Sequence, residues 1–225
     1  MEAEKKTLKD LMVSTTNNCV TIGQCTLEQI STDEGIKVTI NVKEGETKDF
    51  YVLVDDGNKV ALIMSENLGD NVAWFDSGKS TEETTDSDNS NGPITTLAEL
   101  TSLTNEWKIP EITYALSGKG EDGQTQKYPD SQVTAKARLL TYAEANAIGC
   151  TTTRESCPNW MYGNLNNTGS DRDGGGCYKI GYWLSTASAS DAYAVWDISW
   201  QGILSIYGAG TDCSDGLLSV IELSK

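Results

Sequence analysis

The chain has 225 residues, of which 38% are apolar, and a formal net charge of −16 with no histidine. Its length allows one large globular domain, or a small domain beside an average one, with a real hydrophobic core. The acidic balance argues against nucleic acid or an anionic membrane as a partner, because both attract surfaces rich in Lys and Arg. The lack of histidine excludes Ser-His and Cys-His nucleophile pairs and histidine-bound metals.

The first part of the chain is predicted to form a helix followed by a β-meander. Apolar residues recur at helical spacing within residues 1–13. Val38, Ile40 and Val42 alternate with polar residues, and residues 50–54 and 60–64 flank an Asp/Asn/Gly turn, so residues 36–64 are predicted to form a meander of antiparallel strands. The chain has no signal-peptide core and no apolar run long enough to span a bilayer, so we expect that an export segment has been removed and that Met1 serves as a start.

Two short helices are predicted in the middle of the chain, each from a capping box. Thr96 and Glu99 open a helix that Pro110 stops, and Thr141 and Glu144 open a second one. In such a box the Thr hydroxyl and the Glu carboxylate each satisfy a backbone N–H of the first helical turn.

The last third of the chain is predicted to be a small antiparallel sheet. Residues 196–200 alternate large apolar and small polar side chains, a glycine turn follows, and residues 203–207 return. Residues 217–221 form a last apolar strand. We expect Trp183 and Trp196 to be buried, so that the sheet presents short polar groups and other aromatics to solvent.

Six cysteines, none in a CxxC motif, favour disulfides over a zinc site, although free buried thiols remain an alternative. Proximity in sequence pairs the first four, and the last two bracket the C-terminal sheet. The predicted pairs are Cys19 with Cys25, Cys150 with Cys157, and Cys177 with Cys213. Disulfides indicate an oxidising setting, so we expect an extracellular or cell-surface location.

No group of residues indicates catalysis, and we expect a protein that is not an enzyme and needs no cofactor. Asp86 and Asp88 before Gly92, and Asp171 and Asp173 before a Gly run, are weakly similar to calcium loops. Neither has the full ligand spacing of such a loop, so a surface linker is favoured over a calcium site and no metal site is assigned.

Four segments resemble the formylglycine-generating-enzyme/sulfatase-modifying branch of the C-type lectin-like fold. Residues 137–145 resemble its RLPTEAEW segment, residues 60–70 an early strand and loop, and residues 181–186 and 216–221 the closing GYWTST and GVRPVI segments. The last segment has Leu-Ser where the family has Arg-Pro. We identify no catalytic cysteine pair or copper site of the formylglycine enzyme, so its activity is not carried over.

This resemblance implies an α+β C-type lectin-like domain over residues 48–225, with small antiparallel sheets, two short helices and long loops. Polar stretches near residues 77–92 and 117–131 would be loop insertions. Separately, the order of a helix and then a meander, with no export signal, resembles the soluble part of a type IV pilin, so residues 1–47 would be a pilin-like or stalk segment.

A narrower resemblance is to variable proteins of diversity-generating retroelements, which display a hypervariable C-terminal face on this fold. Their randomised positions are chiefly Asn codons, and residues 178–225 contain no Asn whereas residues 1–177 contain 14. The candidate contacts, called the variable face below, are Ser188, Ser190, Asp191, Tyr193, Asp197, Ser199, Trp200, Ile203, Ser205, Tyr207, Thr211, Asp212, Ser214 and Asp215. Tyr beside Ser and Gly is typical of binding surfaces that combine rigid aromatic anchors with adaptable hydrogen-bonding groups.

The favoured hypothesis is therefore an extracellular binding protein with a diversified face, either secreted or displayed on a pilus-like fibre. Its ligand would be a protein or a glycan on another cell or a phage, and it would assemble into the pilus. The alternative is a structural pilin or adhesin subunit of fixed sequence, and the third hypothesis is an enzyme of the sulfatase-modifying type.

Overall fold

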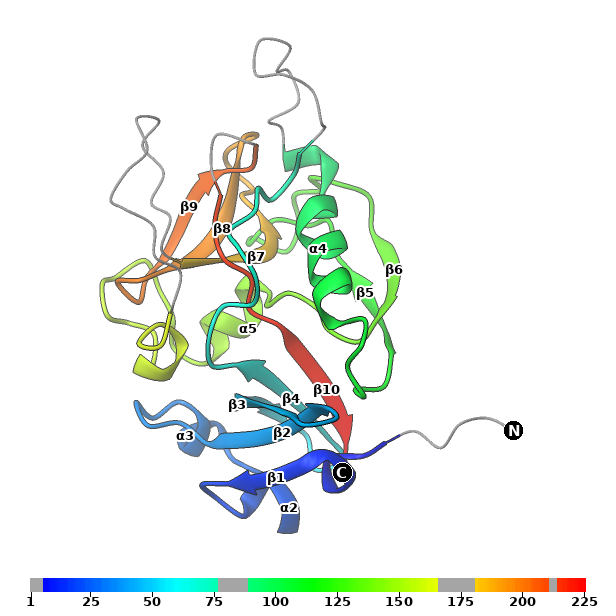
Figure 1. Ribbon diagram of the computed structural model, residues 1–225. Coiled ribbons are helices and arrows are strands. Elements are labelled where there is room, and N and C mark those ends of the chain that lie inside the picture. The colour runs from blue at the N-terminus through cyan, green and yellow to red at the C-terminus, as the bar shows by residue number, and fades with distance from the viewer. Residues whose placement is uncertain (1–5, 77–88, 166–180, 211–213) are drawn as a thin grey trace.

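The computed structural model describes residues 6–76, 89–165, 181–210 and 214–225, and it is a mixed α+β structure with short helices and small antiparallel sheets. The predicted fold class is thereby confirmed at the level of α+β. In Figure 1 a five-stranded sheet forms the lower part of the molecule, and the upper part holds a three-stranded sheet on one side and a long helix with a β-hairpin on the other. No described helix is long and apolar enough to cross a membrane.

The five-stranded sheet contains the predicted meander. Its strands, in spatial order, are β1 (Met12–Thr15), β2 (Lys37–Lys43), β3 (Glu46–Asp55), β4 (Lys59–Met64) and β10 (Val220–Ser224). Side chains of β2 alternate between buried and half-buried, as the sequence predicts. Gly45 and Gly57 have φ angles of 73° and 88° in the two turns, which glycine adopts without the cost other residues pay.

The last strand corrects the predicted C-terminal sheet. It begins at Val220, three residues later than the start expected at residue 217, and it pairs with β4 rather than with the neighbouring C-terminal strands. The first and last strands of the chain therefore belong to one sheet, at its two opposite edges. The predicted boundary after residue 47 falls inside β3, and a single hydrophobic core extends from Leu8 to Leu223 across it.

The three-stranded sheet comprises β7 (Gly181–Ala187), β8 (Ala194–Ser199) and β9 (Leu204–Gly208), with β8 in the middle. The hairpin predicted here is confirmed, with each strand shifted by one or two residues. Gly202 in its turn has a φ angle of 64°, as expected for a tight glycine turn.

The remaining elements pack around these sheets. They are the helices α1 (Leu8–Leu11), α2 (Cys19–Ile22), α3 (Leu27–Ile30), α4 (Ile94–Thr104) and α5 (Tyr142–Ala147), the 3₁₀ turns η2 (Asn89–Asn91) and η3 (Asn159–Met161), and the hairpin of β5 (Ile112–Leu116) and β6 (Ser131–Ala135). The hairpin was not predicted, and the polar segment 117–131 is the loop that joins its strands.

One of the two predicted capping boxes is present at the start of a helix, and the other is not. The box of Thr141 and Glu144 is present as predicted, with the Thr hydroxyl accepting from the Glu144 amide. The capping box predicted at Thr96 and Glu99 is wrong, because α4 already begins two residues before Thr96. The buried hydroxyl of Thr96 instead donates to the carbonyl of Pro93. The helix expected within residues 1–13 shrinks to the single turn α1, since Met12 already begins a strand.

Two predicted disulfides are confirmed, between Cys19 and Cys25 and between Cys150 and Cys157. The third pair, Cys177 and Cys213, lies outside the described residues. So do all four aspartates of the weak calcium motifs, namely Asp86, Asp88, Asp171 and Asp173.

Candidate ligand-binding face

Buried tryptophans support the three-stranded sheet. Trp183 is 1% exposed and its indole N–H donates to the carbonyl of Val72 at 2.7 Å, which ties β7 to the loop after β4. Trp196 is 8% exposed and packs against the ring of Tyr142, with ring centroids 4.7 Å apart. The expectation that both tryptophans are buried is confirmed. Every residue of β7 and β8 is buried, so both faces of the sheet are covered at these two strands.

The variable face divides by solvent exposure. Its exposed members are Ser190, Asp191, Tyr193 and Trp200, and its half-buried members are Ile203, Ser205, Tyr207 and Ser214. Its buried members are Ser188, Asp197, Ser199 and Asp215. Thr211 and Asp212 lie outside the described residues.

The expected exposure of the four buried members is wrong because alternation fails in this sheet. The sequence prediction assumed one solvent face, but β8 is the central strand and both of its faces are covered. Ser199 and Asp197 therefore point into the protein. Ser188 and Asp215 flank the strands and are each 1% exposed. None of these four side chains can meet a ligand in this arrangement.

Asp197 is the most perturbed of them. Its carboxylate accepts a 2.5 Å hydrogen bond from the hydroxyl of Ser205 on the neighbouring strand. Burial raises the pKa of Asp197 to about 7, and the hydrogen bonds from Ser205 only partly offset that rise. The pair links β8 to β9 from within the protein.

The exposed members lie at the two ends of β8, and half-buried members lie on the neighbouring β9, an outer strand of the described sheet. Tyr193 lies at one end, where its carbonyl accepts from the amide of Ala209, and Trp200 lies at the turn at the other end of β8. They are seven residue steps apart, which is about 23 Å at ~3.3 Å per residue along a strand. Tyr193 is 59% exposed and Trp200 is 40% exposed. We call the exposed and half-buried members of the variable face, together with Ile206, the β9 surface.

Ile206 belongs to the β9 surface and the sequence analysis missed it. It is 42% exposed and pairs across the sheet with Trp196. The prediction chose Ser205 and Tyr207, which share one face of the strand, and left out the residue between them. The available signal was that an outer strand can expose side chains of either face.

A separate, concave site is lined in part by Tyr142. A cavity of about 440 Å³ opens between α4, β5, the loop after β5 and the segment before α5. Its walls include the rings of Tyr114 and Tyr142 and the side chains of Leu97 and Leu139. The Tyr114 hydroxyl is buried with no hydrogen-bond partner among the described residues, and burial raises the pKa of Tyr114 to about 12.

Arg138 also lines this cavity, but its guanidinium is already paired with two carboxylates. Its guanidinium donates to both carboxylate oxygens of Glu144, at 2.9 and 2.6 Å, and its Nε donates to Glu222 at 2.9 Å. Burial alone would lower the pKa of Arg138, but the two carboxylates outweigh it and raise that pKa. Arg138 thus joins the start of α5 to β10 as a structural group rather than offering a free cation to a ligand.

Within the described ranges, no group of three or more Asp, Glu or Cys could hold a metal ion. Comparison of the chain with protein-family models finds no matching family, and comparisons with curated proteins and with solved structures find no matching protein.

Proposed function

We propose that the chain is an extracellular binding protein that grips its ligand with the β9 surface and that this surface is diversified by a retroelement. The observation that carries the proposal is the contrast between the aromatic side chains of one sheet. Trp183 on β7 and Trp196 on β8 are buried, whereas Tyr193 and Trp200, at the two ends of β8, are exposed. Asp191 is the one charged side chain among the β9-surface residues named above, so little charge must lose its water when a partner binds.

The β9 surface is also held in place. The carboxylate of Asp191 accepts from the amide of Tyr193 at 2.8 Å, which fixes the turn that carries this aromatic ring. Backbone pairing with β8 fixes the other residues of β9. A fixed surface loses little conformational entropy on binding, which favours affinity.

A C-type lectin-like fold is part of the proposal, and contacts among the four resembling segments support it. Residues 216–221 reach β10, which pairs with β4 from residues 60–70. Arg138 and Val220 exchange two backbone hydrogen bonds, and the amide of Ser185 donates to the carbonyl of Leu140. The four segments are thus one contiguous unit in space.

Diversification is supported by composition and by exposure. The lack of Asn in residues 178–225 is what randomisation of Asn codons would leave. The exposed positions are those at which exchange costs little, since surface substitutions usually change stability by ~0.5 kcal/mol or less. Two disulfides fit display outside the cytoplasm, on a pilus-like fibre in our proposal.

The test is to sequence the DNA around this gene and the same segment in sibling genes. We expect a reverse transcriptase and an Asn-rich near-copy of the C-terminal segment nearby. Substitutions should collect at Ser190, Asp191, Tyr193, Ser205 and Tyr207 and should spare the buried Asp197, Ser199 and Trp183. Sibling genes identical through this segment, with no such near-copy, would overturn diversification and leave the fixed pilin or adhesin subunit.

A further inference from the structure

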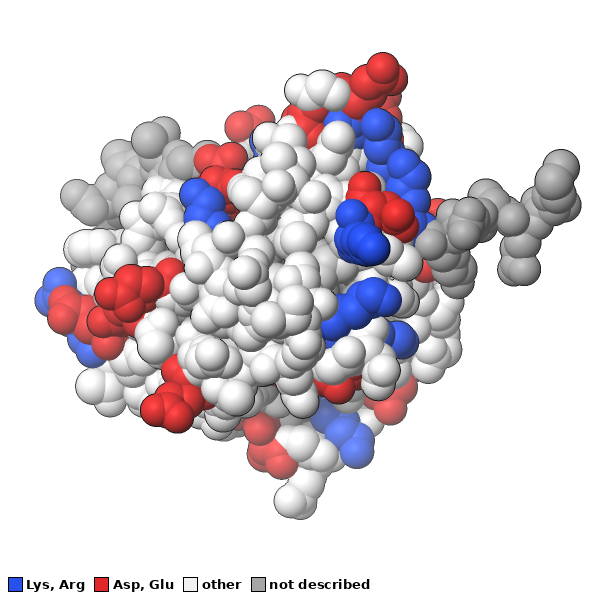
Figure 2. Space-filling model, turned by 90° about the horizontal axis from the view of Figure 1, so that it is seen from below, with Lys and Arg blue, Asp and Glu red and all other residues white. Residues whose placement is uncertain are grey.

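The N-terminal part of the chain contains a long uncharged stretch. No Asp, Glu, Lys or Arg occurs from Leu11 to Leu27, in a chain whose net charge is −16. These residues form β1, α2 and the start of α3, which lie at the lower end of the molecule in Figure 1. Figure 2 views this end and shows charged groups around the edge of a broad uncharged centre.

The same stretch exposes large apolar side chains. Val13 on β1 is 60% exposed, Ile22 at the end of α2 is 85% exposed and Leu27 at the start of α3 is 55% exposed. Single exposed apolar residues are ordinary, but three within one uncharged stretch indicate an interaction surface. We call the surface of residues 12–27 the N-terminal face.

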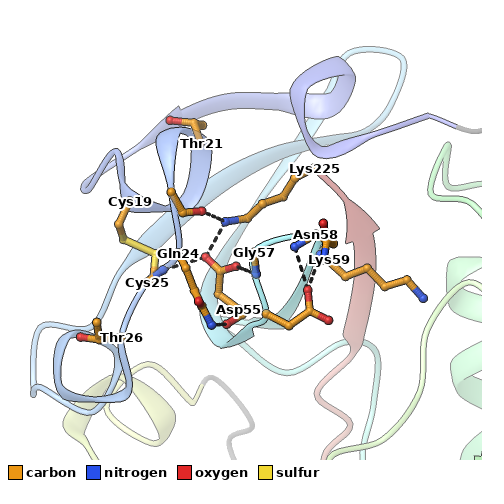
Figure 3. Close-up of polar contacts among 12 residues, drawn as sticks. Cys19, Thr21, Gln24, Cys25, Thr26, Asp55, Gly57, Asn58, Lys59 and Lys225 are labelled. Atoms are coloured by element: carbon orange, nitrogen blue, oxygen red, sulfur yellow. Dashed lines mark hydrogen bonds and ion pairs between the residues drawn. A yellow bond between two sulfur atoms is a disulfide. The ribbon is translucent and has the colours of Figure 1, made fainter.

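The N-terminal face is held rigid from behind (Figure 3). The Cys19–Cys25 disulfide closes the loop that carries Ile22. The buried carboxylate of Asp55 accepts from the amide of Cys25 at 2.9 Å and from the Lys225 ammonium at 2.6 Å. Lys225 also donates to the carbonyl of Gly23 at 2.7 Å. These contacts engage polar groups on the inner side of the loop, while Ile22 projects to solvent.

We propose that the N-terminal face is the contact between two copies of this chain. Two copies that each carry a charge of −16 repel each other, so their contact must avoid opposed carboxylates. The N-terminal face contains none, and a twofold contact would place the same apolar groups against each other. β1 is the outermost strand of its sheet, so no described strand covers its outer edge.

A lipid surface is the less favoured occupant of this face. Helices that bind membrane interfaces surround their apolar side with Lys and Arg, and the N-terminal face has neither. The overall negative charge also opposes adsorption to anionic lipid. The proposed contact lies at the opposite end of the molecule from β9, so it is independent of ligand binding by the β9 surface (Figure 1).

The test is the oligomeric state of the whole chain, measured by sedimentation velocity over a wide concentration range. We expect a monomer–dimer equilibrium in the wild type that Ile22→Lys weakens by about tenfold or more, since a charge would then be buried at the contact. Ile206→Lys is the matched control, because it makes the same change at an exposed isoleucine on the β9 surface. It should dimerise like the wild type.

Added salt should strengthen the dimer, because salt screens the repulsion between acidic copies while leaving an apolar contact intact. Ile22 is 85% exposed, so the variant should fold, and an unchanged circular dichroism spectrum and melting temperature would check this. A wild type that stays monomeric at the highest concentration would overturn the proposal. Dimerisation that Ile206→Lys weakens and Ile22→Lys does not would also overturn it. So would a protein that stays monomeric in solution and binds phosphatidylcholine vesicles in a flotation assay.

Discussion

The two principal sheets each bury a carboxylate but satisfy it in different ways. In the five-stranded sheet, Asp55 accepts from the amides of Cys25 and Gly57 and forms an ion pair with Lys225. In the three-stranded sheet, Asp197 is equally buried and its hydrogen bonds come from Ser205 and backbone amides. A buried charge with a cation beside it acts as a structural lock, whereas one without a cation becomes a proton-binding group.

Removing the cation from the first sheet should have the largest effect. Lys225→Met leaves the Asp55 carboxylate buried without its counter-charge, and we expect a loss of about 3–5 kcal/mol in the free energy of unfolding, measured by chemical denaturation. The reason is that the Asp55 side chain has no exposed area and the Lys225 side chain is only 11% exposed.

Lys37→Met is the matched control for this prediction. Lys37 pairs with Asp49 at 2.5 Å, but the two side chains are 41% and 35% exposed. Ion pairs in water contribute about 0–1 kcal/mol, so this variant should be nearly as stable as the wild type. Equal losses in the two variants would show that the Asp55 pair is no stronger than a surface pair.

In the three-stranded sheet, Asp197 should make the free energy of unfolding depend on pH. With a pKa of about 7 in the folded protein and about 4 in the unfolded chain, Asp197 binds its proton more tightly when folded. Its contribution to stability is therefore complete below pH ~4 and is lost as the pH rises to ~7. Asp197→Asn cannot ionise, so we expect it to exceed the wild type in unfolding free energy by up to about 4 kcal/mol at pH ~8.

The advantage of Asp197→Asn should disappear at pH ~4, and denaturation across this range measures it. Ser205→Ala is a useful companion, because it removes the hydroxyl that favours the charged carboxylate and should move the apparent pKa of Asp197 further upward. An advantage of Asp197→Asn that stays constant with pH would show that Asp197 does not titrate in this range.

The same contrast explains how much of the fold could be predicted from the sequence. The meander of β2 to β4 was predicted because residues 38–42 alternate, two apolar runs follow, and each turn has its own glycine. β8 was placed almost correctly, but its solvent face was wrong. Residues 196–200 alternate in sequence, but a central strand covered on both sides buries both sets of side chains, so the alternation does not identify exposure.

Long-range partners were the other limit of prediction. The pairing of β10 with β4 joins segments about 160 residues apart, and apolar strands alone do not say which edge they join. The cavity beside Tyr114 likewise forms from segments far apart in the sequence, which include Leu97 and residues 185–186. The N-terminal face was visible as a run without charge from Leu11 to Leu27, but its exposure depends on how α2 and β1 fold.

The smallest expected effect lies at the outer edge of the three-stranded sheet. Trp200 is 40% exposed in the hairpin turn, so Trp200→Ala should lower the unfolding free energy by about 1 kcal/mol or less. Tyr193→Ala, at the other end of the β9 surface, should behave in the same way. A loss this small, with an unchanged dependence of the unfolding free energy on denaturant concentration, would show that the surface can exchange even its largest side chains. A diversified receptor requires this. A loss near the 3–5 kcal/mol typical of a core tryptophan would instead make Trp200 part of the scaffold, and the interchangeable surface would shrink to its other residues.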